Sequence, residues 1–211
     1  MLKKSLFRSN ERGSHMKIIL ASGSPRRREI LERLGVDFTI MVSDKEENIT
    51  SDVPEDVVKE LSGMKAEAVY EEAEKTEKDD FAVIGADTVV ACDGKILGKP
   101  KDTGDAARML RMLSGRDHDV FTGVTVKIRQ GGEKKELVFA ERTKVYVYEM
   151  LDSEIIEYIA TGEPMDKAGA YAIQGLFAPY IEKIEGDYYN IVGFPIAKTF
   201  QELKKMQIFL A

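Results

Sequence analysis

The stretch Ile18-Ile19-Leu20-Ala21-Ser22-Gly23-Ser24-Pro25-Arg26-Arg27-Arg28 joins an apolar segment to a basic one through a short polar turn. The apolar residues predict a buried strand. Ser24 is a favourable helix N-cap, Pro25 suits the first helical position, and Gly35 can end the helix at its C′ position. The stretch therefore predicts a strand, a tight turn and a short helix.

The arginines at the start of this predicted helix indicate an anion site. Cations there meet the positive end of the helix dipole, which is unfavourable unless an anion binds. Backbone N–H groups, the hydroxyls of Ser22 and Ser24, and the guanidinium groups of Arg26 and Arg27 all match phosphate oxygens. The alternative is a solvated basic helix start beside an acidic neighbour.

Composition limits the class of protein. The chain has 211 residues, 43% of them hydrophobic, and a net charge of −6, which suits one substantial core in one domain or two tightly joined lobes. The acidic balance argues against broad nucleic-acid binding. The single cysteine, Cys92, excludes an internal disulfide, and no run is apolar enough for a membrane span or a signal peptide. We therefore expect a cytoplasmic protein with no nucleic-acid or membrane partner.

Residues 1–15 are polar and basic without a clear period, and Gly13-Ser14-His15-Met16 is typical of a cleaved expression tag. We expect residues 16–211 to form the folded domain. His118 is then its only histidine, which argues against histidine-based metal binding or a Ser-His-Asp triad.

Helical and strand periods alternate along the rest of the chain. The patterns predict strands over 18–21, 81–92, 95–98, 120–128 and 137–148, and helices over 25–34, 56–74, 106–113, 153–160 and 195–206. Asp93-Gly94 and Gly131-Gly132 are expected to form hairpin turns. Residues 169–193 are expected to be irregular. The order predicts an α/β fold with a mixed sheet.

Asp87 interrupts the apolar segment Gly85-Ala86-Asp87-Thr88-Val89-Val90. A buried ionised carboxylate needs a cation, a metal or several hydrogen bonds, so Asp87 is predicted to face a polar site as a base or a metal ligand. The alternative is a strand-end carboxylate that caps a turn.

Two lysines have unusual positions. Lys65 lies on or beside the apolar stripe of its predicted helix, and Lys99 stands between Gly98 and Pro100 in a rigid loop suited to aiming an ammonium group at phosphate. Each signal is weak alone, because such lysines are more often solvated. The glycine spacing excludes a P-loop.

Four segments together resemble the Maf family of nucleoside triphosphate pyrophosphatases. They are Ile19-Leu20-Ala21-Ser22-Gly23-Ser24-Pro25-Arg26-Arg27, Gly85-Ala86-Asp87-Thr88, Gly98-Lys99-Pro100 and Tyr171-Ala172-Ile173-Gln174-Gly175. The resemblance spans nearly all of residues 16–211. It implies a long mixed sheet with flanking helices and a cleft between two lobes, similar to the inosine triphosphate pyrophosphatases.

The resemblance also implies a reaction: hydrolysis of a nucleoside triphosphate to the monophosphate and pyrophosphate with Mg²⁺ or Mn²⁺. Asp87 matches the position of the proton acceptor that activates water, and Glu46 and Glu47 align with an acidic pair associated with the metal. Triphosphate binding is expected from a set of polar and basic side chains: Ser22, Ser24, Arg26, Arg27, Lys65 and Lys99. A homodimer is among the oligomeric states left open.

Thr88 and Gln174 match the members of the family that act on dTTP and UTP, whereas the 7-methyl-GTP group typically carries Gln after the aspartate. Arg26, Thr88 and Gln174 are thus the expected specificity positions, and the implied role is removal of surplus or non-standard nucleotides. Three alternatives stay open: the same reaction on 7-methyl-GTP, a nucleotide-binding regulator of cell division, and a phosphohydrolase that releases inorganic phosphate.

Overall fold

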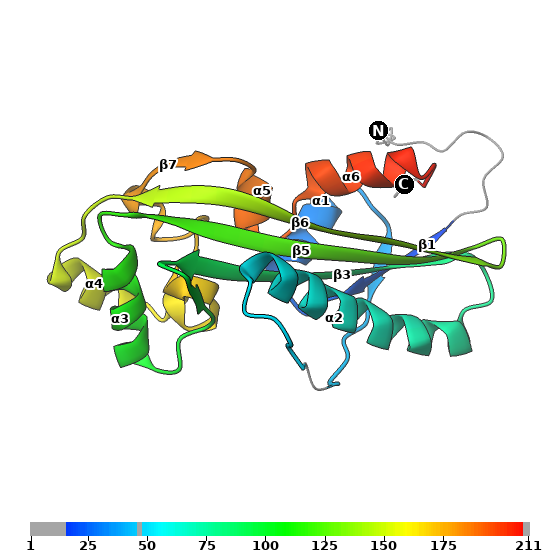
Figure 1. Cartoon of the computed structure of the whole chain (residues 1–211), viewed down its shortest axis with the longest axis horizontal. Helices are drawn as coiled ribbons and strands as arrows, with labels where there is room; N and C mark the ends of the chain where they lie inside the picture. The colour runs from blue at the N-terminus through cyan, green and yellow to red at the C-terminus, as the bar shows by residue number, and fades with distance from the viewer. Residues whose placement is uncertain (1–15, 46–47, 209–211) are drawn as a thin grey trace, which may run out of the picture.

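The computed structural model describes residues 16–45 and 48–208 and contains a seven-stranded sheet (Figure 1). The strands are β1 (Lys17–Ala21), β2 (Phe38–Ile40), β3 (Phe81–Cys92), β4 (Lys95–Leu97), β5 (Asp117–Gln130), β6 (Glu133–Val147) and β7 (Ile181–Glu185). Their order is β2-β1-β3-β5-β6-β7, with β4 paired to β3. β1 runs parallel to β2 and β3, and the other pairs are antiparallel. The predicted mixed sheet in an α/β fold is confirmed.

Within these described ranges, six α-helices surround the sheet: α1 (Pro25–Arg33), α2 (Pro54–Thr76), α3 (Thr103–Leu113), α4 (Asp152–Ala160), α5 (Tyr188–Val192) and α6 (Ile196–Lys205). Successive side chains of a strand point to opposite faces of a sheet, and β1 is an example. Ile19 packs in a cluster with α2, whereas Leu20 packs in a cluster with α1 and α6. The sheet therefore separates α2 from α1 and α6.

The core has two main parts along the long strands. One lies around β1, α1 and α6, and the other around α3 and α4 at the opposite end of β5 and β6 (Figure 1). The partly buried Ile173 packs against both. This division fits the expected two lobes.

Two glycines allow α2 to lie directly on the sheet. A Cβ atom on Gly85 would stand 2.4 Å from the carbonyl oxygen of Ser62, and one on Gly123 would stand 2.1 Å from that of Val58. These glycines serve close approach rather than a turn. This close contact between α2 and the sheet holds α2, and with it Lys65, at a fixed distance from β3.

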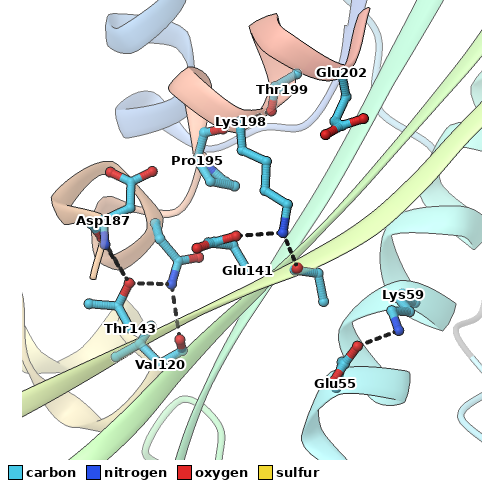
Figure 2. A network of polar contacts seen from close by, with 12 residues as sticks. Glu55, Lys59, Val120, Glu141, Thr143, Asp187, Pro195, Lys198, Thr199 and Glu202 are labelled. Atoms are coloured by element: carbon cyan, nitrogen blue, oxygen red, sulfur yellow. Dashed lines mark hydrogen bonds and ion pairs between the residues drawn. The ribbon is translucent and has the colours of Figure 1, made fainter. Parts of the chain in front are cut away.

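Polar contacts fasten the C-terminal helices to the sheet (Figure 2). Thr143 on β6 accepts a hydrogen bond from the backbone N–H of Asp187 and another from the side chain of Asn190, each 3.0 Å long, and donates to the carbonyl oxygen of Asp187. Lys198 on α6 pairs with Glu141 at 2.6 Å. These contacts fix the segment that enters α5 and the helix that follows it.

Most elements agree with the sequence-based predictions. The strand over 81–92 is found unchanged as β3, the helix over 56–74 extends to Pro54–Thr76, and Cys92 is buried. Gly131 and Gly132 make the predicted turn with φ of 59° and 83°, and Gly35 follows α1 with φ of 72°. Ser24 occupies the N-cap, but its side chain makes no capping hydrogen bond to the described residues.

The prediction of an irregular segment over 169–193 was wrong in part, because this segment contains β7 and α5. β2 was not predicted either. β2 and β7 are short strands at the edges of the sheet. Their sequences are too short to show a clear alternation of apolar and polar residues. Within the part of the chain that the structure describes, no helix is long and apolar enough to cross a membrane.

Candidate active site

A cavity of about 450 Å³ opens where β1 ends. β1 pairs with β3 as far as Ala21 opposite Gly85, and β4 pairs with the same side of β3 from Val90 onward. Among the residues that the structure describes, no strand covers positions 86–89 on that side. This gap in the sheet exposes Asp87 and Thr88 to the cavity in a mostly buried strand.

The turn after β1 forms one wall of the gap. Ser22, Gly23, Ser24 and Arg26 all line the cavity. The backbone N–H of Ser24 donates to Ser22 Oγ over 3.3 Å, so the turn folds back on itself. Arg26 is partly exposed, and its guanidinium lies 3.9 Å from Asp166, which also lines the cavity. The expected anion-binding residues therefore do face a common space.

Arg27 differs from Arg26 in its surroundings. Its Nε donates to the carbonyl oxygen of Gly193 over 2.7 Å, Nη1 to Ser22 Oγ over 3.0 Å, and Nη2 to Thr88 Oγ1 over 3.2 Å. Burial lowers the pKa of Arg27, and the charge of Asp87 acts in the opposite direction. These bonds use three of the five N–H donors of the guanidinium group. Arg27 thus joins α1, β3 and the end of α5 into one wall.

The hydroxyl of Thr88 is also engaged. It receives the Arg27 bond and stands 2.9 Å from Thr122 Oγ1, which donates in turn to the carbonyl oxygen of Asn190 over 2.8 Å. These bonds use its O–H and one of its two acceptor sites, so one acceptor site remains for a ligand. Thr88 therefore shapes the wall between the anion-binding turn and α5.

Asp87 and Lys65 form an ion pair inside the cavity, between β3 and α2. Their side chains are 18% and 26% exposed, so both are accessible to a ligand. Asp87 therefore faces a polar site, as its sequence position predicts, and it does not cap a turn. Lys99, from the loop after β4, lines the same cavity.

Another part of the lining comes from residues 166–168 and 171–174. Gln174 lies in an exposed turn, and Tyr171, which is buried, contributes beside it. Tyr171 Oη stands 2.8 Å from His118 Nε2, while His118 Nδ1 has no hydrogen-bond partner among the described residues. Asp166 and Lys167 also line the cavity and were not identified from the sequence, because no motif distinguishes them from surface residues. The α5 residues Ile191 and Val192 and the following Gly193 line it too. Their segment, 186–195, also resembles the family in sequence, but no role was predicted for it.

Among the described residues, the carboxylates that line the cavity are Asp87 and Asp166. Mg²⁺ commonly takes one or two protein carboxylates and completes its shell with phosphate oxygens and water, and Asp87 fits that requirement. Outside 1–15, 46–47 and 209–211, no three His, Cys, Asp or Glu side chains are grouped to hold a metal. The predicted ligands Glu46 and Glu47 lie outside the described residues. Ser43, three residues earlier, lines the cavity.

The fold and cavity define a mixed-sheet α/β protein with several cationic side chains around one strand carboxylate. Residues 17–206 match the family model described as Maf-like protein, and the chain belongs to that family. It is 52% identical over 201 residues to the dTTP/UTP pyrophosphatase of Agathobacter rectalis, covering 91% of this chain and 98% of that protein. It is 51% identical over 195 residues to that of Lachnoclostridium phytofermentans, with coverages of 92% and 97%.

Among solved structures, the chain is similar to the nucleoside-triphosphatase, or dITP/XTP pyrophosphatase, of Mycobacterium abscessus. The sequence identity is 15% and the TM-score 0.39, over 91% of this chain and 96% of that one.

Proposed function

We propose that this protein is a nucleoside triphosphate pyrophosphatase that hydrolyses dTTP and UTP to the monophosphate and pyrophosphate. The observation that carries the proposal is the convergence of Asp87, Lys65, Lys99 and Arg26 on one cavity at the end of β1. The names of the relatives, dTTP/UTP pyrophosphatase, agree with it.

The triphosphate lies against the turn after β1. Ser22 and Ser24 donate to phosphate oxygens, and Arg26, Lys65 and Lys99 reach the chain of phosphates from three different elements. Cations and N–H donors fixed in advance cost no reorganisation when charge develops on the leaving pyrophosphate. Arg27 contributes mainly by holding Ser22 and Thr88 in place.

Asp87 acts as the general base. Its carboxylate accepts a proton from a water molecule, and the water oxygen attacks the α-phosphorus. The bond between the α-phosphorus and its bridging oxygen to the β-phosphorus then breaks, and the electron pair leaves with pyrophosphate. Such proton transfer to a positioned carboxylate is typical of general base catalysis.

A divalent cation, Mg²⁺ or Mn²⁺, would be held by Asp87 and by the acidic pair Glu46 and Glu47, together with phosphate oxygens. When bound, it would neutralise phosphate charge and polarise the reacting phosphoryl group. Lys65 stays close to Asp87 whether or not the cation is bound, and its positive charge limits the net negative charge of the site.

Gln174 reads the base. Its side chain amide offers one acceptor and two donors, which can match the O4 and N3–H of uracil or thymine. It lines the same cavity as the anion-binding turn, so one cavity can hold both the phosphates and the base. Thr88 lines the same cavity beside Asp87 and contributes to its shape.

Hydrolysis of a panel containing dTTP, UTP, CTP and 7-methyl-GTP with Mg²⁺ or Mn²⁺ tests the proposal, provided that pyrophosphate is resolved from inorganic phosphate. Pyrophosphate release from dTTP and UTP is expected. Pyrophosphate from 7-methyl-GTP alone would contradict the substrate assignment, and inorganic phosphate as the first product would contradict attack at the α-phosphorus. Binding without turnover would favour the regulator.

A further inference from the structure

The turn 172–176, which presents Gln174 to the cavity, is tied at both ends by the same pair of side chains. The backbone N–H of Ala172 donates to Tyr158 Oη over 3.2 Å. The backbone N–H of Leu176 donates to Glu163 over 3.0 and 3.1 Å to its two carboxylate oxygens. Tyr158 itself donates to Glu163 Oε1 over 2.8 Å, so the two side chains are also bonded to each other.

The residues that flank this turn are firmly buried. Tyr171 and Phe177 pack ring to ring at 4.8 Å, and Phe177 also contacts the ring of Tyr158 at 5.3 Å. Gln174 and Leu176 are accessible between these anchors. The position of Gln174 thus depends on how the five residues between the anchors are held, and the Tyr158–Glu163 pair holds two of their backbone N–H groups.

Gly175 shows how closely the turn approaches this pair. A Cβ atom at this position would lie 2.2 Å from Glu163 Oε2 and 2.4 Å from the carboxyl carbon. A side chain there is compatible only with a displaced carboxylate. Glycine allows this close approach without displacing the carboxylate, because it carries no Cβ.

The hydrogen-bond roles are well defined. Tyr158 is buried, and burial together with the bond to Glu163 raises the pKa of its hydroxyl, so the hydroxyl stays protonated at neutral pH. It can then donate to the carboxylate and accept from Ala172 at the same time. Neither Tyr158 nor Glu163 is among the described residues that line the cavity.

We propose that Tyr158 and Glu163 are positioning residues that set base specificity by fixing the turn that carries Gln174. The inference rests on the proposed function, because it takes Gln174 as the residue that reads the base. An enzyme that distinguishes bases by hydrogen bonds needs its donors and acceptors at fixed positions. A mutation outside the site that displaces them slightly can therefore remove the selectivity. The proposed phosphate-binding side chains Ser22, Arg26 and Lys99 come from other segments of the chain, so phosphate binding should not depend on this pair.

The test compares UTP with CTP, which differ only at the base edge, and uses inorganic tripolyphosphate as a competing ligand without a base. In Tyr158→Phe, Glu163→Ala and Gly175→Ala, we expect the ratio of kcat/KM for UTP over CTP to fall about tenfold, mainly through KM for UTP. Inhibition by tripolyphosphate should stay within about twofold of the wild type. Glu163→Gln keeps an acceptor oxygen and should restore part of the selectivity.

Tyr180→Phe is the matched control. Its ring also packs against Phe177, at 5.5 Å, but its hydroxyl interacts with Glu154 on α4. Wild-type selectivity is expected in this variant. Unchanged selectivity in Tyr158→Phe and Glu163→Ala would overturn the inference, as would a parallel loss of tripolyphosphate inhibition. A wild-type enzyme that does not prefer UTP over CTP would overturn the substrate assignment itself, and the inference with it.

Discussion

Lys65 on α2 and Asp87 on β3 form an ion pair inside the cavity, although 22 positions separate them in the sequence. The pair depends on the direct contact of α2 with the sheet at Gly85, two residues before Asp87. It places a positive charge beside the proposed base and leaves both side chains within reach of a phosphate ligand. In the proposed mechanism, triphosphate binding and proton transfer therefore take place at one point of the cavity.

Replacing Asp87 with asparagine should reduce kcat by about 100- to 10,000-fold, because the amide cannot accept the proton of water. Triphosphate affinity measured without a divalent cation should be retained, since the ammonium group of Lys65 remains. Pyrophosphate release gives kcat, and competition by tripolyphosphate gives affinity. Asp93→Asn, in the exposed turn after the same strand, should behave as the wild type. Undiminished turnover in Asp87→Asn would refute the general-base role.

Replacement by lysine should have different effects at the neighbouring residues Arg26 and Arg27. Arg27→Lys loses the planar fork that serves Gly193, Ser22 and Thr88, and should lower the free energy of unfolding by about 1–3 kcal/mol. Arg26→Lys should mainly raise KM, with little change in stability, because Arg26 faces the cavity. Denaturant unfolding and steady-state kinetics of both variants separate the two effects. Equal losses of stability would contradict this division of roles.

Gly123→Ala should destabilise the protein by roughly 3 kcal/mol, since its Cβ would collide with the backbone of Val58 and push α2 from the sheet. Gly63→Ala, within α2, is the control: its Cβ would come no closer than 3.9 Å to Thr125. Because alanine favours the helix by about 1 kcal/mol, this variant should be neutral or more stable. Thermal unfolding of both proteins would reveal the difference, and similar midpoints would argue against the close contact.

Stability should fall in mild acid because of His118. Burial lowers its pKa to about 4, against about 6.5 when the chain is unfolded. Between these values the unfolded chain binds a proton that the folded protein does not, so the free energy of unfolding decreases as the pH falls through this range. The histidine should cost roughly 2 kcal/mol between pH 7 and pH 5, and nothing above that range.

His118→Gln removes this titration and keeps a polar partner for Tyr171. Urea unfolding at both pH values measures the effect as the difference between wild type and variant, which subtracts the contribution of the carboxylates. The same pH dependence in both proteins would show that His118 does not titrate as its burial predicts.

The sequence predicted some residues of the site and not others. Asp87 stood out because a carboxylate inside an apolar strand requires a polar environment. Arg26 and Arg27 were indistinguishable by sequence, because adjacent residues at a helix start share the same local signal. Their different surroundings depend on where Gly193 and Thr88 lie in three dimensions. Nor did any local pattern mark Tyr158 and Glu163, whose contacts with residues 172–176 exist only in the folded chain.

The sequence by itself determined the long strands, the hairpins and most helices, since alternation, helical periodicity and turn residues act over a few neighbours. It also determined the family, through short motifs in a fixed order. Only the tertiary structure decided that β2 and β7 form at the edges of the sheet, because short strands gain their stability from pairing. It alone decided that Lys65 meets Asp87 in the gap left where β1 ends, because that meeting depends on packing between distant segments.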